Sequence, residues 1–316
     1  MTVLQTRPVG GAPTVRPRRR GSARRREHLE GIGLVLPATV IIVVTIVVPI
    51  AWNAVLSFQD VSLRSLRGGN LFGAFTLENY VAVLTSASFW SSLWTTVVYS
   101  VGTTLGSIAL GLAAALALRR AFPGRGAVRA VLLLPYVAPV VAMTFVWQMM
   151  LNPQFGIVNI GGTRLLGWDQ PIDFLGRAPY ALMTVIAFEI WRYFPFALIF
   201  ISARMTALPK DVDEAAVLDG ATPTQAFRHV TLPQLMPVLA LLSVLRLIMT
   251  FNKFDDVYLL TGGAAGTEVA AVRVYNQLVG SFDIGGGATN AMVLALVLGL
   301  LLAVYFVLVG RKESDS

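Results

Sequence analysis

Three charged side chains, Glu189, Arg192 and Arg246, lie within segments of the chain that are otherwise apolar. A charge in the middle of a membrane-spanning helix costs about 2.5–3.5 kcal/mol on insertion scales, so such residues usually have a function. Glu189 and Arg192 are three residues apart, share a helix face and can pair. Arg246, Thr250 and Lys253 form one polar stripe. Such residues either line a path for a solute or form ion pairs that lock helices together, and the sequence alone leaves both interpretations open.

Residues that would support catalysis or metal binding are scarce. The chain has no cysteine and two histidines, and no Ser/His or Asp/Asp pair stands in a plausible catalytic register, so we expect neither an enzyme nor a metal site. A nucleotide-binding P-loop needs Gly-Lys followed by Ser or Thr. None of the lysines, at positions 210, 253 and 312, follows a glycine. The run GGAAGTE from Gly262 lacks the lysine and is interpreted as a structural turn, so we expect no cofactor on this chain.

The composition is that of a membrane protein. Of the 316 residues, 55% are hydrophobic and 13% are charged, whereas soluble domains carry about 25% charged residues. A backbone in lipid must satisfy its own hydrogen bonds, so each crossing is expected to be a helix of about 20 apolar residues. We predict an all-α integral membrane protein with six transmembrane helices, at about 32–58, 90–118, 130–151, 179–201, 235–258 and 284–310.

Small and proline residues within these spans predict how the helices pack. Gly102 and Gly106 have the spacing of a close helix–helix contact. A polar stripe beside them is expected to form hydrogen bonds between helices and not to bind a ligand; it consists of Thr96, Ser100, Thr103 and Ser107. Pro135 and Pro139 are expected to kink or interrupt the third span.

The net charge of +8 is concentrated in an N-terminal arm, residues 1–30, which contains eight arginines. The arm is predicted to be disordered and to fix the topology, with contact to anionic lipid head groups as a second interpretation. Nucleic acid is not an expected partner, because no aromatic residues are interleaved with the arginines. A cleaved signal peptide is the weaker interpretation of the first span, whose apolar run is long.

The distribution of lysine and arginine predicts the orientation. The arm, the loops 119–129 and 202–234, and the tail together hold seventeen of these residues, and the connections on the opposite face hold five. Because the basic face of a membrane protein is cytoplasmic, we expect both termini in the cytoplasm. The predicted layout is a basic arm at 1–30, a membrane domain at 31–310 and a cytoplasmic tail at 311–316.

The connection between spans four and five, residues 209–233, is polar and includes the sequence EAAVLDGATPTQAFRHVTLP. Gly220 suits the residue that follows a helix. Thr222 and Gln225 have the spacing of a capping box at the start of a second helix, which Pro233 is expected to stop. We predict an ordered pair of helices. A simple structured connector is an alternative, and a DNA-binding helix–turn–helix is disfavoured by the net acidic charge.

This connection resembles a known signature. It has EAA at 214–216, then Gly220 and then VTLP at 230–233, and so resembles the pattern EAA-x3-G-x9-I-x-L-P of permease subunits of bacterial binding-protein-dependent ABC importers. Valine in place of isoleucine is the one departure. Three further runs are similar to carbohydrate-type permeases of the maltose, trehalose and glycerol-3-phosphate group: LLPYVAP from Leu133, EIWRYFPFALI from Glu189 and FNKFDDVYLLTGG from Phe251. The resemblance begins at the first span.

The resemblance implies that the EAA segment is a coupling helix that sits on a cytoplasmic ATPase. The residues it implies for this contact are Glu214, Ala215, Ala216, Asp219 and Gly220. It also implies three partners: a second permease subunit in a heterodimer, an ATPase dimer that carries the ATP and Mg, and an extracellular substrate-binding protein. The implied location is the bacterial plasma membrane.

The resemblance further implies a sugar as the solute, a disaccharide or an oligosaccharide, with glycerol-3-phosphate or a polyol as the alternative. Sugar sites combine aromatic faces with hydrogen-bonding groups. The candidate residues of the substrate path are therefore Glu189, Trp191, Arg192, Tyr193, Arg246, Thr250, Asn252, Lys253 and Tyr258. An autonomous channel or ion-coupled secondary transporter is a second hypothesis, which the buried charges allow but which gives no reason for the EAA signature.

Overall fold

The computed structural model describes residues 33–314, except 63–67 and 69–72. The arm predicted at 1–30 lies outside the described residues, as do the last two residues of the tail. The described chain is helical, with two isolated antiparallel bridges, between Gln59 and Phe75 and between Ser62 and Asp283. Within it, five helices are long and apolar enough to cross a membrane, or six if one bent pair counts as a single span. This is consistent with the predicted all-α membrane fold.

The chain divides into two units, residues 1–53 and 54–316. A continuous helix, Gly33–Ser57, is the first candidate span. It contains a wide π-helical turn, η1 (Val43–Val47), followed by α2 (Val48–Ser57). Every described side chain from 33 to 52 is exposed, and this apolar surface is suited to contact with lipid.

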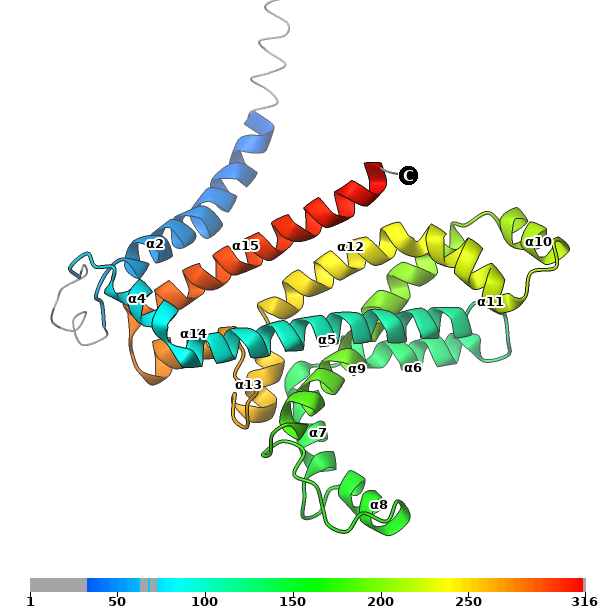
Figure 1. The fold of residues 1–316 in the computed structure, drawn as a ribbon, viewed down its shortest axis with the longest axis horizontal. Coiled ribbons are helices and arrows are strands. Elements are labelled where there is room, and N and C mark those ends of the chain that lie inside the picture. Colours follow the sequence, from blue (N-terminus) through cyan, green and yellow to red (C-terminus); the bar gives the residue numbers. More distant parts are fainter. Residues whose placement is uncertain (1–32, 63–67, 69–72, 315–316) are drawn as a thin grey trace, which may run out of the picture. The chain divides into compact units, whose positions relative to one another are not determined.

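The second unit is built around three long helices (Figure 1): α5 (Ala87–Ala117), α9 (Tyr180–Thr206) and α12 (Leu232–Phe251). Small residues allow α5 and α9 to approach closely. A Cβ added to Gly106 would collide with Ile190, and one added to Gly111 would lie 2.6 Å from the Cβ of Ala197. The close contact predicted from Gly102 and Gly106 is therefore confirmed.

The third span is broken into α6 (Arg125–Val137) and α7 (Val140–Leu151), which meet at an angle of 98°. Pro139 is the N-cap of α7, and Ala138 before it is extended, with φ −67° and ψ 143°. A proline has no N–H to donate and disfavours helical geometry in the preceding residue, which accounts for the break. The predicted interruption is confirmed, and it lies at Pro139, because Pro135 stays inside α6.

Shorter elements complete the unit. They are α4 (Glu78–Thr85), α8 (Ile157–Leu165), α10 (Lys210–Leu218), α11 (Pro223–Ala226), η2 (Phe227–Thr231), α13 (Asp255–Thr261), α14 (Ala270–Tyr275) and η3 (Asn276–Gly280), before the last long helix, α15 (Ile284–Ser314). One apolar core joins α4, α5, α14 and α15 through residues that include Val83, Phe89, Ala270 and Val293. A second joins α5, α9 and α12, through Ala115, Leu198 and Leu242 among others.

The helix of the fifth span ends earlier than predicted; the predicted range was 235–258. Its helix ends at Phe251, and α13 begins separately at Asp255. Asp255 and Asp256 occupy the first turn of α13, where the helix dipole favours negative charge. The apolar pattern of the sequence runs through this point, and hydrophobicity alone therefore did not reveal the break.

The polar connection forms the predicted pair of helices. After α10, Gly220 adopts φ +78° and the N–H of Ala221 donates to the carbonyl of Ala216 at 3.0 Å, the long hydrogen bond of a Schellman turn. Thr222 then caps α11, and its capping box with Gln225 is complete. Both sequence predictions for these caps are confirmed.

Pro233 does not stop the second helix, contrary to the prediction. The helix continues from Pro223 to Phe251. The wide turn η2 lies just before Pro233, and the N–H of Leu232 donates to Phe227, five residues back. The widened turn makes room for the proline ring, which would clash with a carbonyl four residues earlier. The same arrangement recurs in the first span, where η1 lies just before Pro49.

Candidate functional site

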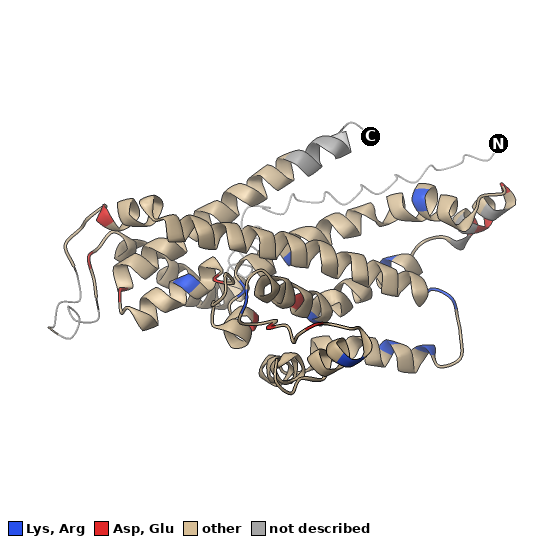
Figure 2. Cartoon of the chain, turned by 60° about the horizontal axis from the view of Figure 1, so that its bottom comes forward, with Lys and Arg blue, Asp and Glu red and all other residues tan. Residues whose placement is uncertain are grey.

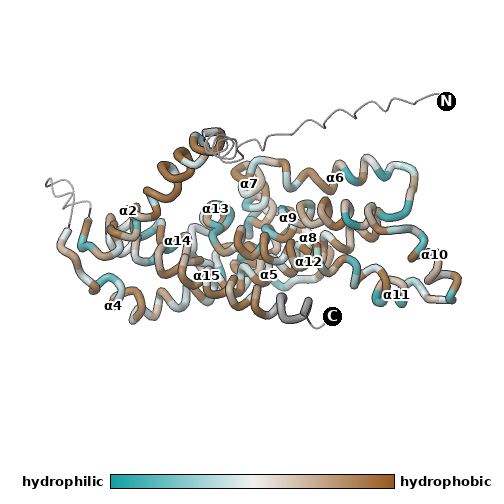
Figure 3. The backbone as a smooth tube through the Cα atoms, turned by 90° about the horizontal axis from the view of Figure 1, so that it is seen from above, coloured by the Kyte–Doolittle hydropathy of each residue, from teal (hydrophilic) through white to brown (hydrophobic). Residues whose placement is uncertain are grey.

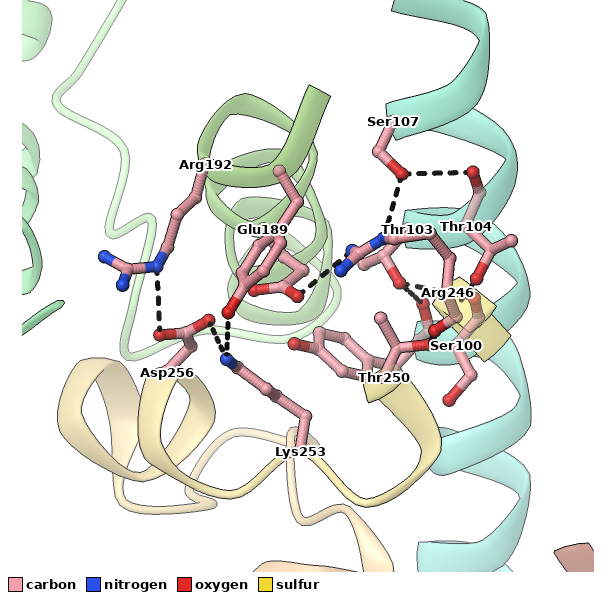
Figure 4. A network of polar contacts seen from close by, with 12 residues as sticks. Ser100, Thr103, Thr104, Ser107, Glu189, Arg192, Arg246, Thr250, Lys253 and Asp256 are labelled. Atoms are coloured by element: carbon pink, nitrogen blue, oxygen red, sulfur yellow. Dashed lines mark hydrogen bonds and ion pairs between the residues drawn. The ribbon is translucent and has the colours of Figure 1, made fainter. Parts of the chain in front are cut away.

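A buried ion pair joins two of the long helices. The Nη2 of Arg246 on α12 lies 3.2 Å from Oε1 of Glu189 on α9, and both side chains are 0% exposed. The Nε of Arg246 donates to the hydroxyl of Ser107 on α5 at 3.3 Å (Figure 4). One guanidinium therefore ties three helices together, and its charge is balanced within the core.

A second centre of charge lies beside the first, around Asp256 on α13, which is also 0% exposed. Its carboxylate is 3.2 Å from Nζ of Lys253 and 3.9 Å from Nε of Arg192. Lys253 also pairs with Asp255 at 3.3 Å, on the more exposed side. The lysine therefore bridges two carboxylates at the start of α13.

Tyr193 connects these two centres. Its hydroxyl accepts a hydrogen bond from Nζ of Lys253 at 2.8 Å. The guanidinium carbon of Arg246 lies 4.2 Å from the centroid of its ring, within the range of a cation–π contact. Figure 4 shows Glu189, Arg192, Lys253 and Asp256 gathered together. The charged residues therefore form one connected network, which we call the charged cluster: Glu189, Arg192, Tyr193, Arg246, Lys253 and Asp256.

Hydroxyl groups extend the charged cluster along α5. Thr250 donates to the carbonyl of Arg246 at 2.7 Å and lies 3.4 Å from the hydroxyl of Thr104. Of the stripe predicted to bond between helices, Ser107 accepts from Arg246, and Thr96 accepts from the N–H of Ala270 at 2.8 Å. Thr103 bonds within its own helix, to Tyr99. The stripe is fully buried. Two of its four residues, Thr96 and Ser107, form hydrogen bonds to other helices.

The structure brings together six of the predicted path residues and leaves three apart. Glu189, Arg192, Tyr193, Arg246, Thr250 and Lys253 meet in or beside the charged cluster. Trp191 packs on Trp147, with ring centroids 5.6 Å apart. Asn252 is exposed and donates to Ile248 of its own helix. Tyr258 stacks on Phe254 and contacts Tyr275.

The predicted pair between Glu189 and Arg192 is corrected by the structure. Glu189 pairs with Arg246, and Arg192 is directed toward Asp256. The spacing of three residues does place both on the same helix, but partners from other helices lie closer to each charge. Asp256 was missed as a candidate, although it lies three residues after Lys253, in the run FNKFDDVYLLTGG.

The predicted coupling residues lie at one end of the second unit, on α10 and the turn that follows (Figure 3). Glu214, Ala215, Asp219 and Gly220 are exposed. Ala216 is 9% exposed and faces inward, so it packs within the chain and does not belong to the outer face. Leu218, at the end of α10, is 87% exposed. The exposed side chains of this segment therefore include the carboxylates of Glu214 and Asp219 and the apolar side chain of Leu218.

Charged residues are confined to few places in the second unit (Figure 2). The long helices carry few of them, and those present gather at helix ends and in the interior of the bundle. This distribution, with the candidate spans, defines a multi-pass membrane protein.

Comparison with known proteins identifies the family. Residues 107–312 match the family described as "Binding-protein-dependent transport system inner membrane component". The inner membrane ABC transporter permease protein YcjO of Escherichia coli K12 is 38% identical over 251 residues, which cover 79% of this chain and 85% of YcjO. The trehalose/maltose transport system permease protein MalF of Thermococcus litoralis is 32% identical over 295 residues, 92% of this chain and 96% of MalF.

A third relative and a solved structure agree with this. The diacetylchitobiose uptake system permease protein DasB of Streptomyces coelicolor is 32% identical over 329 residues, and the alignment covers 100% of this chain and 100% of DasB. A chain in the crystal structure of a bacterial alginate ABC transporter, in complex with an alginate pentasaccharide-bound periplasmic protein, shares the fold, with a TM-score of 0.80 at 20% identity, over 93% of this chain and 98% of that one. The chain belongs to the binding-protein-dependent transport system inner membrane components. It is a permease subunit of an ABC importer and not an enzyme.

Proposed function

We propose that this permease carries a disaccharide or an oligosaccharide, delivered by an extracellular binding protein. Relatives named for trehalose, maltose and diacetylchitobiose align with more than nine-tenths of the chain, which supports a sugar of this size. Glycerol-3-phosphate or a polyol is the alternative solute, because the sequence runs that resemble carbohydrate permeases occur in that group as well.

We propose that both termini and the α10–α11 pair lie in the cytoplasm. The supporting observation is that the arginine-rich connection 119–129 and the polar connection 209–233 meet at one end of the bundle. A pocket there is lined by Arg119 and Arg120, which follow α5, and by Ala221, Pro223 and Phe227 of the α10–α11 region. The distribution of lysine and arginine, seventeen on the predicted cytoplasmic face against five on the opposite face, supports this orientation.

The outer face of α10 is proposed to contact a cytoplasmic ATPase dimer that carries the ATP and Mg. Glu214 and Asp219 supply negative charge, and the small side chain of Ala215 allows close approach. Leu218 supplies an apolar side chain that is exposed to water when no partner covers it. The Schellman turn and the capping box hold this pair of helices in one shape. A rigid pair can transmit a displacement, whereas a loose loop would absorb it.

Movement of α11 is proposed to reach the charged cluster directly. The helix from Pro223 to Phe251 is continuous and carries Arg246, which is bonded to Glu189 and Ser107 on its neighbours. The three helices then move as one body when the ATPase dimer closes. Alternating access arises from this rigid-body motion against a second permease subunit.

We propose that the charged residues take two different roles, according to their burial. A residue that lines a path shared with a second subunit is exposed when its own chain stands alone. Glu189, Arg246 and Asp256 are 0% exposed in the chain alone, so we assign them to locking the helices. Tyr193 and Lys253 are partly exposed. They are the members of the charged cluster proposed to face the solute.

Reconstitution tests this function against an autonomous, ion-coupled transporter. The permease is co-expressed with the second permease and the ATPase of its own transport system, purified, and placed in liposomes with the binding protein. We expect co-purification of the subunits and uptake of a labelled disaccharide only with ATP. Uptake by this chain alone, driven by a proton or sodium gradient, would refute the proposal.

A further inference from the structure

A pocket rich in arginine lies at the end of α5, α6 and α9. It has a volume of about 340 Å³, and its basic side chains are Arg119, Arg125 and Arg129. Two hydroxyl residues of α9, Ser202 and Thr206, line the same pocket. No acidic side chain is among the residues that line it in the described part of the chain. Three guanidinium groups and two hydroxyl groups therefore line one common space.

Helix α6 adds to the positive potential of this pocket. It begins at Arg125, has no acidic residue in its first turn, and carries Arg129 one turn later. The N-terminus of a helix bears partial positive charge and is stabilised by anions. Arg125 in the first turn opposes the helix dipole, an unfavourable arrangement that a bound anion would offset. The Nε of Arg125 is buried without a hydrogen-bond partner among the described residues.

An apolar groove continues from the arginine pocket. A second pocket, of about 260 Å³, shares Arg129, Ser202 and Thr206 with the first. The rest of its wall is Leu133, Leu198, Ile199 and Ala203, from α6 and α9. Ile199 is 47% exposed. Figure 1 shows the connection by which α5 turns back into α6 at this end. A basic, hydroxyl-lined pocket thus opens into an apolar groove along two membrane helices.

We propose that this composite pocket binds one anionic phospholipid. The phosphate would lie among Arg119, Arg125 and Arg129, with Ser202 and Thr206 as further donors, and an acyl chain would follow the groove past Ile199. A free phosphate would use the arginines but would leave the groove without a role, and a lipid uses both. Anionic lipids attract basic residues at the membrane surface, and the site lies where helices leave the apolar region. The inference does not depend on which solute is carried.

Native mass spectrometry of the assembled importer in detergent tests the site. It is titrated with phosphatidylglycerol and, separately, with phosphatidylcholine of the same acyl chains. We expect at least one phosphatidylglycerol to bind in clear preference to phosphatidylcholine. Each arginine near a membrane surface contributes about fivefold to anionic lipid binding, so Arg125→Gln with Arg129→Gln should weaken the preferred binding about twenty-five-fold.

Matched variants separate this site from general lipid contact. Arg164→Gln with Arg177→Gln removes the same amount of charge, in α8 and just before α9. Neither residue lines the pocket, so this double variant should leave lipid binding unchanged. Ile199→Trp should fill the groove and weaken the binding of phosphatidylglycerol. Equal binding of both lipids, or equal loss in the two double variants, would overturn the proposal. Full displacement of the lipid by millimolar inorganic phosphate would identify a free-anion site instead.

Discussion

At the scale of single residues, the guanidinium of Arg246 links three helices, because it contacts Glu189 on α9 and Ser107 on α5 from its own position on α12. The sequence located Glu189, Arg192 and Arg246 because charge inside an apolar run is rare. It could not assign their partners, because the pairs that form, Arg246 with Glu189 and Lys253 with Asp256, depend on how α9, α12 and α13 pack. A rule based on spacing within one helix sees only local neighbours.

Removing one partner of the buried pair tests whether it locks the helices. Arg246→Leu leaves the carboxylate of Glu189 buried without its partner, which typically costs about 3–5 kcal/mol. We expect less assembled importer in the membrane and a lower melting temperature. The double variant Arg246→Leu with Glu189→Leu removes both charges and should recover most of the lost stability.

Transport by the double variant distinguishes the two roles of this pair. If the pair locks the helices, uptake per assembled complex in the double variant stays near that of the wild type. Normal assembly with strongly reduced uptake would mean that Arg246 or Glu189 acts on the solute, and the assignment to locking would then be wrong.

At the scale of helices, caps and breaks were predicted well where a single residue type controls the backbone. Pro139 broke the third span, and Thr222 with Gln225 formed the capping box, as predicted. Pro233 did not end its helix, because the π turn η2 just before it makes room for the proline ring. That turn has no signature in the residue pattern. The end of α12 at Phe251 was missed for a similar reason: hydrophobicity reports burial or lipid contact and not continuity.

Close packing of α5 on α9 predicts a strong effect of one methyl group. A Cβ at Gly111 would lie 2.6 Å from the Cβ of Ala197 and 2.9 Å from the backbone nitrogen of Leu198. Gly111→Ala should therefore cost about 1–3 kcal/mol through overpacking, measured as a fall in melting temperature. Gly299→Ala in α15 is the matched control, because no atom lies within 4 Å of its added Cβ. Equal melting temperatures for the two variants would contradict this packing.

The turn after α10 predicts different effects of two substitutions. Gly220 has φ +78°, a conformation that a β-branched residue adopts only with strain of order 1–3 kcal/mol. Gly220→Val should loosen α10, seen as faster amide hydrogen exchange in residues 211–218 and reduced uptake. Gly220→Asn should be close to the wild type, because asparagine tolerates this conformation. Similar exchange in both variants would show that the turn does not hold the helix.

At the scale of the whole molecule, family membership was predictable from the signature at 214–233, and the comparisons confirm it. The way the outer face of α10 is built was not predictable. Ala216 turned inward and Leu218 outward, which depends on how α10 is oriented against the rest of the chain. The partners that complete the importer belong to other chains, and only family resemblance points to them.

We propose that α10 couples ATP hydrolysis to transport. The most direct test is the ratio of sugar taken up to ATP hydrolysed by the reconstituted importer, measured for Glu214→Arg. Asp169→Arg is the control, with the same change of charge at an exposed position near the opposite end of α9. We expect the ratio to fall at least about tenfold in Glu214→Arg, because a charge pair at an interface is lost, and to stay unchanged in the control. An unchanged ratio in Glu214→Arg, with uptake at the full rate, would mean that α10 does not couple hydrolysis to transport.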